Sequence, residues 1–344
     1  MNNSAELSPR REKLFNRIHE RHGDHLAMDR GTLMKRRVPR DHIVSEGAAA
    51  MLRHRGFPVP VAEQPEKTVP ELERFLLAQK NTKLQKVGFG RQIPQGAHYI
   101  KTSKPLFFDF RNADLLMEDL AEQGLILESD AVGLDFGCST GRTVRTLAAG
   151  LPHMSWIGVD PVPSSIEYAA KRFKHHTWLV NNQEPPMPID DESVDFVVSK
   201  SVWTHFSKAA AVAWIRDIER ILRPSGLAAI TVHGWHDLAR RVYYNDPSPR
   251  YGLLDGAKNL MSIEYLELVT DELEAHGFQF RPYANTGWQG DLGRIENSST
   301  ADWGLTFMTK AWAQEHLTSP GLTLKHRSIG RTGHRHDVLI FEKK

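Results

Sequence analysis

The sequence predicts an α/β protein built on a doubly wound, mostly parallel sheet. Between about residues 111 and 235, short apolar stretches alternate with amphipathic segments of helix length. Short apolar strands that are buried on both faces and separated by helices form parallel sheets. Residues 1–110 show only short helical patterns with connecting prolines, which predicts a mainly helical N-terminal extension.

The predicted strands are five short apolar runs followed by a final pair. The five runs occupy residues 131–134, 156–159, 177–180, 194–198 and 227–232. Helical segments with apolar residues on one side separate them, at 113–123, 143–149, 164–173 and 207–222. The final pair, Leu322–Ile329 and Val338–Glu342, is separated by a turn with glycine and histidine, which predicts an antiparallel hairpin at the sheet edge.

Composition excludes several classes of protein. The chain has 344 residues with 44 lysines and arginines against 42 aspartates and glutamates, which argues against a protein whose main task is holding nucleic acid, since that task usually leaves a strong positive excess. The single cysteine, Cys138, excludes a disulfide framework and a multi-cysteine zinc site, and favours the reducing cytoplasm. We expect neither a membrane span nor a secretory signal, because no apolar run approaches the roughly 20 residues of a membrane helix and the N-terminus is polar.

Positive charge is concentrated at the N-terminus. Residues 1–55 hold twelve lysines and arginines against seven acidic residues, including the run Lys35–Arg37. A solvated helical arm is the interpretation that we favour. Contact with an anionic partner, such as nucleic acid, phosphate or a membrane surface, is the alternative.

The loop Asp135–Gly141, which reads D-F-G-C-S-T-G, lies between the first predicted strand and the next helix. Ligands bind at this end of the strands in a doubly wound sheet. The glycines allow close approach to the backbone, and the helix N-terminus offers free N–H groups. The spacing matches neither a dinucleotide fingerprint nor a phosphate loop, and Asp135 suits the ammonium group of an amino-acid moiety. An ordinary glycine turn is the alternative.

Asp160 closes the second predicted strand, 25 residues after Asp135. An acidic side chain at this position can accept hydrogen bonds from both hydroxyls of a ribose. An aspartate at a strand end is equally compatible with a plain cap. Its spacing from the first loop strengthens the ribose interpretation.

Two further motifs follow, P-I-D-D-E-S-V-D-F-V-V-S at Pro188–Ser199 and I-L-R-P-S-G-L at Ile221–Leu227. The four motifs in this order resemble the class I S-adenosylmethionine-dependent methyltransferases, closely over residues 111–235 and more loosely to 344. The family pattern V-L-D-x-G-C-G-x-G-R reads G-L-D-F-G-C-S-T-G-R here, so Ser139 stands where a glycine is usual. The resemblance implies a seven-stranded Rossmann-like sheet with a reversed last strand, and S-adenosylmethionine as cofactor.

The resemblance also implies which residues contact the cofactor. It assigns Asp135, Gly137, Ser139 and Gly141 to the methionine portion, and Asp160 to the ribose. The other implied contacts are an amide beside the adenine and two residues that end the fourth strand: Asn182 or Gln183, then Ser199 and Lys200.

A catalytic base is needed only if the acceptor is a hydroxyl, because an amine or thioether already offers a lone pair. The candidates are histidines that follow the fourth and fifth strands: His205, His233 and His236. Their alternative role is to orient the loops that carry them. We expect no metal site, because His334 and His336 have no further ligand nearby except Asp337.

We expect an N-terminal helical accessory region at 1–110 and the methyltransferase domain at 111–344, with 235–300 as an insertion that covers the acceptor. The insertion is rich in tryptophan and tyrosine, whose rings stack on sugars or simply fill small cores. The segment Trp303–Thr309 and the final strand resemble, more distantly, family members found with surface-glycan biosynthesis.

The leading hypothesis is methyl transfer to a small molecule or glycan, at oxygen, and nucleic acid is not the expected partner. Cytosine ring-carbon methylation requires a catalytic cysteine, but Cys138 lies in the cofactor loop. Residues 199–202 lack the [DN]-P-P-[YFW] motif of base amino methylation. The alternatives are an RNA-modifying methyltransferase that uses the basic N-terminal arm, and a non-catalytic partner or regulator with the same fold. No motif indicates the oligomeric state.

Overall fold

The computed structural model describes eight segments of the chain: 7–26, 38–64, 67–78, 110–127, 129–243, 262–283, 300–332 and 335–344. The chain divides into two compact units. The sheet unit comprises Val38–Lys200, Arg216–Ala229 and Ile340–Lys344. The insertion unit comprises Met1–Arg37, Ser201–Ile215 and Ile230–Leu339.

One seven-stranded sheet has the order β3-β2-β1-β4-β5-β9-β8. Its strands are β1 (Val132–Phe136), β2 (Ser155–Asp160), β3 (Thr177–Val180), β4 (Val194–Ser199), β5 (Leu222–Val232), β8 (Leu322–Ser328) and β9 (Asp337–Lys343). Strand β1 pairs in parallel with β2 and β4, and β2 pairs in parallel with β3. The predicted α/β class and mostly parallel sheet are confirmed, and the two final strands are neighbours at the sheet edge.

The inner strands form the core of the sheet unit. Leu134, Val197 and Ala228 have no exposed surface, which agrees with the continuous apolar runs in the sequence. Trp156 packs edge-on against Phe196 with ring centroids 5.6 Å apart. Gly133 lies beneath this pair, and a Cβ atom there would come within 2.5 Å of the Phe196 ring. The strand therefore needs glycine at this position.

Strand β5 begins earlier than the sequence predicts. The helix α8 (Lys208–Ile221) ends where predicted, but the strand starts at Leu222 rather than at 227. The predicted Pro-Ser-Gly turn is present inside the strand as a local distortion, in which Ser225 has a φ of 64°.

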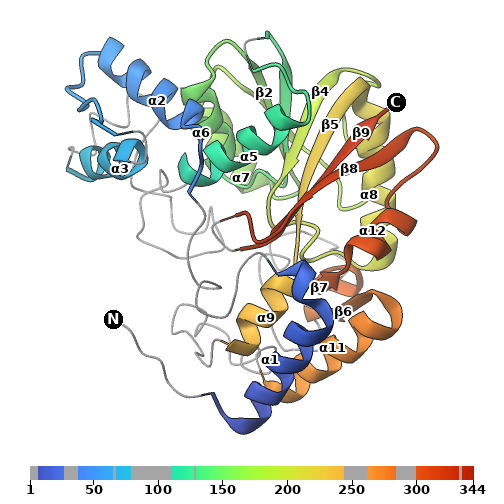
Figure 1. Cartoon of the computed structure of the whole chain (residues 1–344). Helices are drawn as coiled ribbons and strands as arrows, with labels where there is room; N and C mark the ends of the chain where they lie inside the picture. The colour runs from blue at the N-terminus through green and yellow to red at the C-terminus, as the bar shows by residue number, and fades with distance from the viewer. Residues whose placement is uncertain are drawn as a thin grey trace. The chain divides into compact units, whose positions relative to one another are not determined.

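Five further helices belong to the sheet unit. They are α2 (Ile43–His54), α3 (Thr68–Ala78), α5 (Phe110–Glu122), α6 (Arg142–Gly150) and α7 (Pro163–Arg172). Figure 1 shows α2 lying beside α3, α5 and α6, with which it makes contact. Helices α2 and α6 cross closely, since a Cβ atom on Gly47 would lie 2.1 Å from the Gly150 carbonyl oxygen. The predicted boundary at residue 110 stays a prediction, although helices from both sides of it pack together.

A carboxylate from α5 caps the N-terminus of α2. Asp114 Oδ1 accepts hydrogen bonds from the backbone N–H groups of Val44 at 2.8 Å and Ser45 at 3.1 Å. The residue before α2, His42, makes no side-chain cap of its own. Burial raises the pKa of Asp114 to about 7. Burial therefore destabilises the charged form of Asp114, and the two backbone hydrogen bonds partly stabilise that form.

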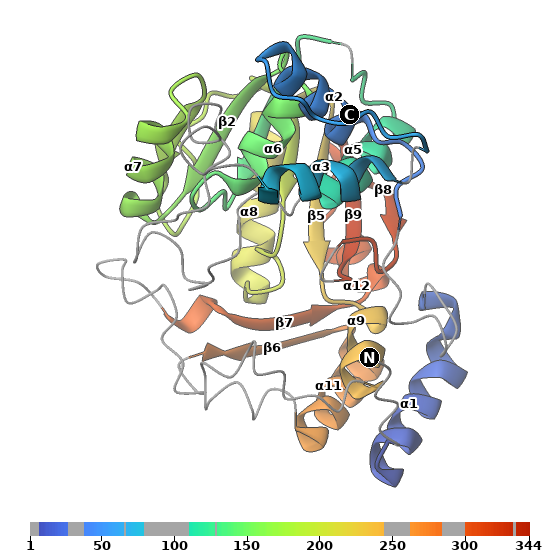
Figure 2. The same ribbon diagram turned by 90° about the vertical axis from the view of Figure 1, so that its left-hand side faces the viewer.

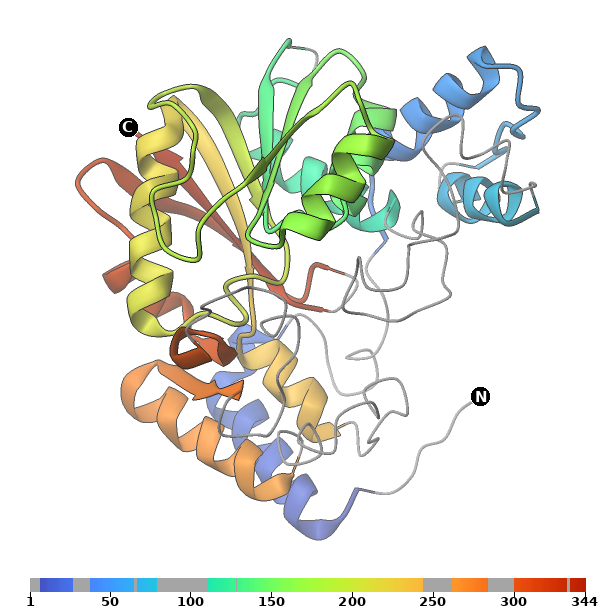
Figure 3. The same cartoon turned by 180° about the vertical axis from the view of Figure 1, so that it is seen from behind.

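The insertion unit gathers three long helices and a two-stranded sheet. The helices are α1 (Pro9–His22), α9 (Trp235–Tyr243) and α11 (Ile263–His276), with the shorter α12 (Lys310–His316), η1 (Gly23–His25) and η5 (Thr300–Asp302). Strand β6 (Phe278–Pro282) pairs antiparallel with β7 (Gly304–Met308), as Figure 2 shows. Figure 3 shows α1 beside α9 and α11, where Phe15 and Ile18 join a buried apolar cluster with Leu238 and Leu266.

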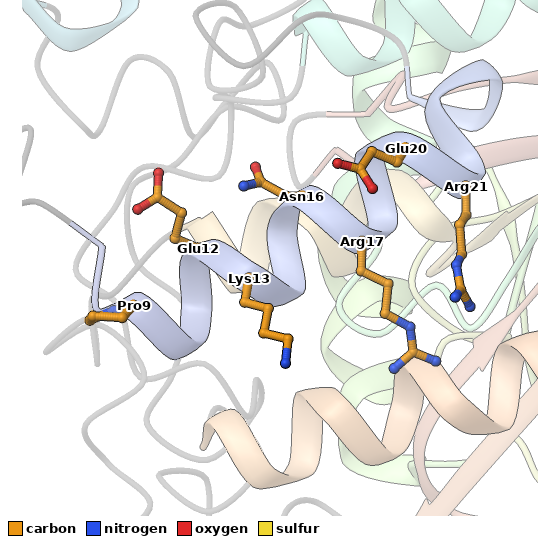
Figure 4. Close-up of a pocket in the computed structure, with 7 residues that line it drawn as sticks. All are labelled: Pro9, Glu12, Lys13, Asn16, Arg17, Glu20 and Arg21. Carbon is orange, nitrogen blue, oxygen red and sulfur yellow. The ribbon is translucent and has the colours of Figure 1, made fainter.

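The basic face of α1 is paired with acidic side chains of α11. Arg10 binds Glu264 and Glu267, and Arg17 binds Asp271 and Glu274, with N–O distances between 2.5 and 2.7 Å. Figure 4 shows Arg17 pointing from α1 toward α11. The expected solvated arm is therefore a packed helix over residues 9–22. The run Lys35–Arg37 lies outside the described residues.

A shallow groove follows α1 along its side chains from Pro9 to Arg21, and none of the predicted site residues lines it (Figure 4).

Among the helices that the structure describes, none combines the length and the apolar character needed to cross a membrane.

Candidate functional site

The loop after β1 is shaped by two glycines in the left-handed region. Gly137 has a φ of 78° and Gly141 a φ of 77°, a conformation that side chains with a Cβ atom rarely adopt. The N–H groups of Gly137 and Cys138 both donate to the Val159 carbonyl, at 2.9 and 3.0 Å. These bonds fix the loop at the end of β2. Gly141 then starts α6 without any side-chain cap.

Ser139 adopts a backbone conformation that is uncommon for a residue with a side chain. Its φ is 49°, also in the left-handed region. Its N–H group donates to Asp160 Oδ2 at 2.8 Å, which holds the loop in place despite the strain.

Asp160 joins the two loops that follow β1 and β2. One carboxylate oxygen accepts from Ser139 and the other from the Val162 N–H at 3.0 Å. The side chain is 7% exposed. Each carboxylate oxygen can accept a second hydrogen bond, so the predicted ribose contact is compatible with this structural role. Asp135 lies at the end of β1 and is buried.

Trp178, which no sequence motif marks, closes over two glycines. A Cβ atom on Gly141 or on Gly158 would lie 2.4 Å from its indole ring. The indole N–H donates to the Phe173 carbonyl at 2.9 Å, which fixes the ring. A tryptophan in a short predicted strand carries no signal for this role, because its partners are distant in sequence.

Three amide side chains follow β3, the two predicted ones and Asn181. Asn182 is exposed and Gln183 is partly buried, whereas Asn181, directly after the strand, is 5% exposed. Asn181 Oδ1 is buried and accepts no hydrogen bond from the described residues. Asn181 is therefore an additional candidate for the adenine contact. Its signal in the sequence is its position immediately after the third strand.

The two residues that end β4 and follow it have different environments. Ser199 is 1% exposed and its hydroxyl donates to the Phe136 carbonyl at 3.0 Å. This bond ties β4 to the end of β1. Lys200 is partly exposed and follows the strand. Cofactor contact for both stays a prediction.

Cys138 is buried within the loop. Burial raises the pKa of its thiol well above the usual value, and Asp160 and Asp135 raise it further. The thiol is thus a poor nucleophile, in agreement with the exclusion of cysteine catalysis.

In the insertion unit, His205 is held at one ring nitrogen. Nδ1 lies 2.9 Å from the Gly304 carbonyl oxygen and 2.8 Å from the Tyr283 hydroxyl. The ring also packs against Trp303, with centroids 4.8 Å apart. Burial lowers the pKa of His205 to about 4, so the ring is neutral at pH 7. Among the described residues, no hydrogen bond reaches Nε2.

His233 uses both ring nitrogens inside the unit. Nδ1 lies 2.8 Å from the Thr306 carbonyl oxygen, and Nε2 lies 3.2 Å from a guanidinium nitrogen of Arg241. Burial lowers its pKa to about 3. A neutral ring that donates from Nδ1 and accepts at Nε2 satisfies both contacts. Both ring nitrogens are thus engaged within the unit, and the catalytic role of His233 stays a prediction.

The residues after His233 form a buried charged cluster. Burial by itself would raise the pKa of Asp237, but Arg241 and Arg240 hold it well below its usual range. Their closest distances to its carboxylate oxygens are 2.5 and 2.8 Å. His236 is 1% exposed and packs on Gly330, whose added Cβ atom would lie 2.5 Å from the imidazole. The catalytic role of His236 stays a prediction.

The remaining predictions concern metal and the aromatic insertion. Among the described residues, no group of three or more histidine, cysteine or acidic side chains could hold a metal ion. His336 is buried, and His334 lies outside the described residues. Much of the predicted insertion at 235–300 also lies outside them, including its aromatic residues Tyr244, Tyr251 and Trp288.

Comparison with known proteins gives one family match and several relatives. Residues 134–226 match the model of a methyltransferase domain. The tRNA N(3)-cytidine methyltransferase METTL2 of Gallus gallus is 29% identical over 116 residues, which are 31% of each chain. An uncharacterized methyltransferase of Mycobacterium tuberculosis is 32% identical over 94 residues, 27% of this chain and 36% of that protein.

Among solved structures, a SAM-dependent methyltransferase of Methanosarcina mazei aligns with a TM-score of 0.42 at 16% identity. The alignment covers 65% of this chain and 96% of that one. The chain spans only about a third of the length of the curated relatives it matches.

The strand order, the glycine loop and the family match together define the class. Residues 134–226 form a methyltransferase domain, and the strand order around it is consistent with the class I, S-adenosylmethionine-dependent type. S-adenosylmethionine is the cofactor of this class.

The residues after β1, β2 and β3 fit that cofactor chemically. Gly137 and Gly141 give the loop two left-handed turns, and the Asp160 carboxylate, whose two oxygens accept from Ser139 and Val162, is of the chemical type that binds ribose hydroxyls. Asn181 Oδ1 is a buried acceptor without a partner among the described residues, and so is Thr140 Oγ1. Such groups are costly to bury unless a ligand satisfies them.

Proposed function

We propose that the whole protein transfers a methyl group from S-adenosylmethionine to a hydroxyl oxygen of a small molecule or glycan. The observation that carries the oxygen assignment is the single-sided anchoring of His205, whose Nδ1 is held and whose Nε2 is not. A hydroxyl acceptor must lose a proton, and a positioned imidazole can take it. His205 lies six residues after Ser199, which ends β4.

In this proposal the sheet unit holds the cofactor. Asp135 and the Gly137–Gly141 loop receive the methionine portion, Asp160 the ribose and Asn181 the adenine. Gln183 and Asn182 stay alternatives for the adenine, and Ser199 and Lys200 line the same site. The sulfonium methyl of the bound cofactor supplies the reactive carbon, so these residues contribute binding and orientation.

His205 is the proposed base. At pH 7 the His205 ring is neutral, and Nε2 carries the lone pair that accepts the acceptor's proton. The neighbouring Trp303 ring offers an apolar face of the kind that stacks on sugars and aromatic rings. His233 and His236 stay in the proposal only as supports of the surrounding structure.

An RNA acceptor is the second candidate, because one relative is named as a tRNA methyltransferase. In this alternative the basic N-terminal arm contacts the RNA. In α1, however, Arg10 and Arg17 are paired with acidic residues of α11, and Arg21 binds Glu274 at 3.0 Å. These pairs use the charge that phosphate contacts would need. The observation favours the small-molecule or glycan acceptor.

A labelled-methyl assay tests the proposal. The full chain is incubated with methyl-labelled S-adenosylmethionine and a panel of sugars, phenols, carboxylates, amines and bulk tRNA. We expect label on a hydroxyl compound and none on tRNA. Label on tRNA alone would replace the proposal by the RNA alternative, and no label on any acceptor with cofactor bound would favour a non-catalytic protein.

Substitution of the base sharpens the test. We expect His205→Gln to lower kcat by roughly 10²-fold or more while leaving cofactor affinity unchanged. His316→Gln is the matched control, because His316 is also partly buried in the insertion unit and stacks on Trp312 at 4.7 Å. Equal kcat in both variants would remove His205 from the mechanism.

A further inference from the structure

We infer that Tyr283 is a positioning residue that supports the positive charge of His205 during the reaction, in the tautomer that the Gly304 carbonyl selects. This inference rests on the proposed role of His205 as the base. No motif in the sequence indicates Tyr283, since it lies 78 positions from His205. The inference depends on three features of the insertion unit.

The first feature is the convergence of two oxygens on one nitrogen. The Tyr283 hydroxyl and the Gly304 carbonyl lie 2.8 and 2.9 Å from His205 Nδ1. A carbonyl oxygen only accepts, so Nδ1 must carry the hydrogen. The hydroxyl oxygen then shares this donor as a second acceptor. The opposite tautomer would place the Nδ1 lone pair against the carbonyl oxygen.

The second feature is the rigidity of the supporting strands. Pro282 of β6 pairs with Gly304 of β7, so Tyr283 and the carbonyl come from adjacent rungs of the same small sheet. The Tyr283 N–H donates to the Trp303 carbonyl at 3.0 Å, and the Gly304 N–H donates to the His205 carbonyl at 2.7 Å. The side chain of Tyr283 is 6% exposed. The ring is therefore fixed from both ends.

The third feature is electrostatic. With Nδ1–H bonded to two oxygens, Nε2 is the nitrogen that carries the lone pair. When Nε2 takes a proton the ring becomes an imidazolium, and the oxygens at Nδ1 stabilise its charge. Tyr283 therefore raises the basicity of a ring whose pKa is lowered by burial. The small sheet of the insertion unit thus sets both the direction and the strength of the base.

The test uses the full chain with its histidine rings labelled with ¹⁵N. In the wild type we expect His205 to show a protonated Nδ1 and an unprotonated Nε2 at pH 7. Tyr283→Phe removes only the hydroxyl, and we expect it to lower the pKa of His205 by about half a unit to one unit, with kcat about three- to tenfold lower and cofactor KM unchanged.

Tyr265→Phe is the matched control. Tyr265 is 3% exposed in the same unit, and its hydroxyl donates to Gln279 Oε1 at 3.0 Å, away from His205. We expect this variant to leave the His205 signals unchanged. Thermal unfolding of both variants shows whether each is folded.

The two proposals fail in different ways. A wild-type His205 that carries its proton on Nε2, or signals and pKa that do not move in Tyr283→Phe, would overturn the positioning role whatever the activity. If the signals move as expected but His205→Gln retains full kcat, the positioning holds and the proposed base is wrong.

Discussion

At the scale of single residues, the loop Asp135–Gly141 contains a strained residue, because Ser139 lies in the left-handed region. A residue with a Cβ atom in the left-handed region costs about 1–2 kcal/mol. The bond from its N–H group to Asp160 offsets part of this cost and makes the carboxylate a link between two loops. In the proposed function Asp160 also contacts the ribose, so its loss would affect both the cofactor contact and the link between the two loops.

Replacing Ser139 by glycine should relieve the strain. Glycine adopts a φ of 49° without a steric penalty but is more flexible in the unfolded chain, so we expect Ser139→Gly to stabilise the fold by about 0.5–1 kcal/mol. Urea unfolding measures the change. Ser164→Gly, an exposed position in α7, should instead destabilise by about 0.5 kcal/mol, and the same sign for both would contradict the strain.

At the scale of elements, helices near the N-terminus are anchored by charged groups on partners that are distant in sequence. The carboxylate of Asp114 on α5 replaces a local cap for α2, and acidic residues of α11 pair with α1. These anchors explain why short helices with modest apolar faces are ordered. Each predicts a measurable effect on stability.

Asp114 should make stability depend on pH. Its pKa in the folded protein is about 7, above the 3.8 of an ordinary aspartate, so the folded state holds this proton more tightly. The free energy of unfolding therefore falls as pH rises from about 4 to about 7. Asp114→Asn keeps an oxygen to cap α2. We expect the fall in the free energy of unfolding between pH 5 and pH 8, measured by urea unfolding, to be smaller in this variant by at least about 1 kcal/mol. Asp130→Asn, an exposed control, should keep the wild-type slope, and an unchanged slope in both would contradict the assignment.

Glu274 connects α11 to Arg17, Arg21 and His22 of α1. Removing it leaves several donors without their acceptor, so we expect Glu274→Ala to destabilise by about 1 kcal/mol at low salt and by less at high salt. Glu272→Ala on the same helix is the control, because no ion pair to Glu272 is present among the described residues. Equal effects of the two variants, or no salt dependence, would refute the anchoring.

At the scale of the whole molecule, the sheet and the loop after β1 follow from local patterns in the sequence. Apolar runs predict β1 to β5, and the residues Asp135, Gly137 and Gly141 mark the loop. Other features depend on contacts between distant segments. The cap from Asp114, the cover by Trp178 and the contact from Tyr283 to His205 arise only when the chain is folded, so periodicity and spacing could not predict them.

The uneven charge shows the same limit. The basic excess of residues 1–55 predicts a helical arm that is exposed to solvent or bound to an anionic partner. The acidic partner of α1 lies in the same chain, about 250 positions later, at Glu264 and Glu267. Composition gives the amount of charge in a segment but not where its counter-charges fold.

Titration calorimetry with S-adenosylmethionine tests the central claim most directly. The account predicts one cofactor molecule bound per full-length chain, with a dissociation constant below about 1 mM. It also predicts that Asp160→Ala, folded by its thermal transition, binds at least about tenfold more weakly, because it loses the ribose acceptor and the link to Ser139. Absence of binding by the wild type, or unchanged affinity in Asp160→Ala, would contradict the account.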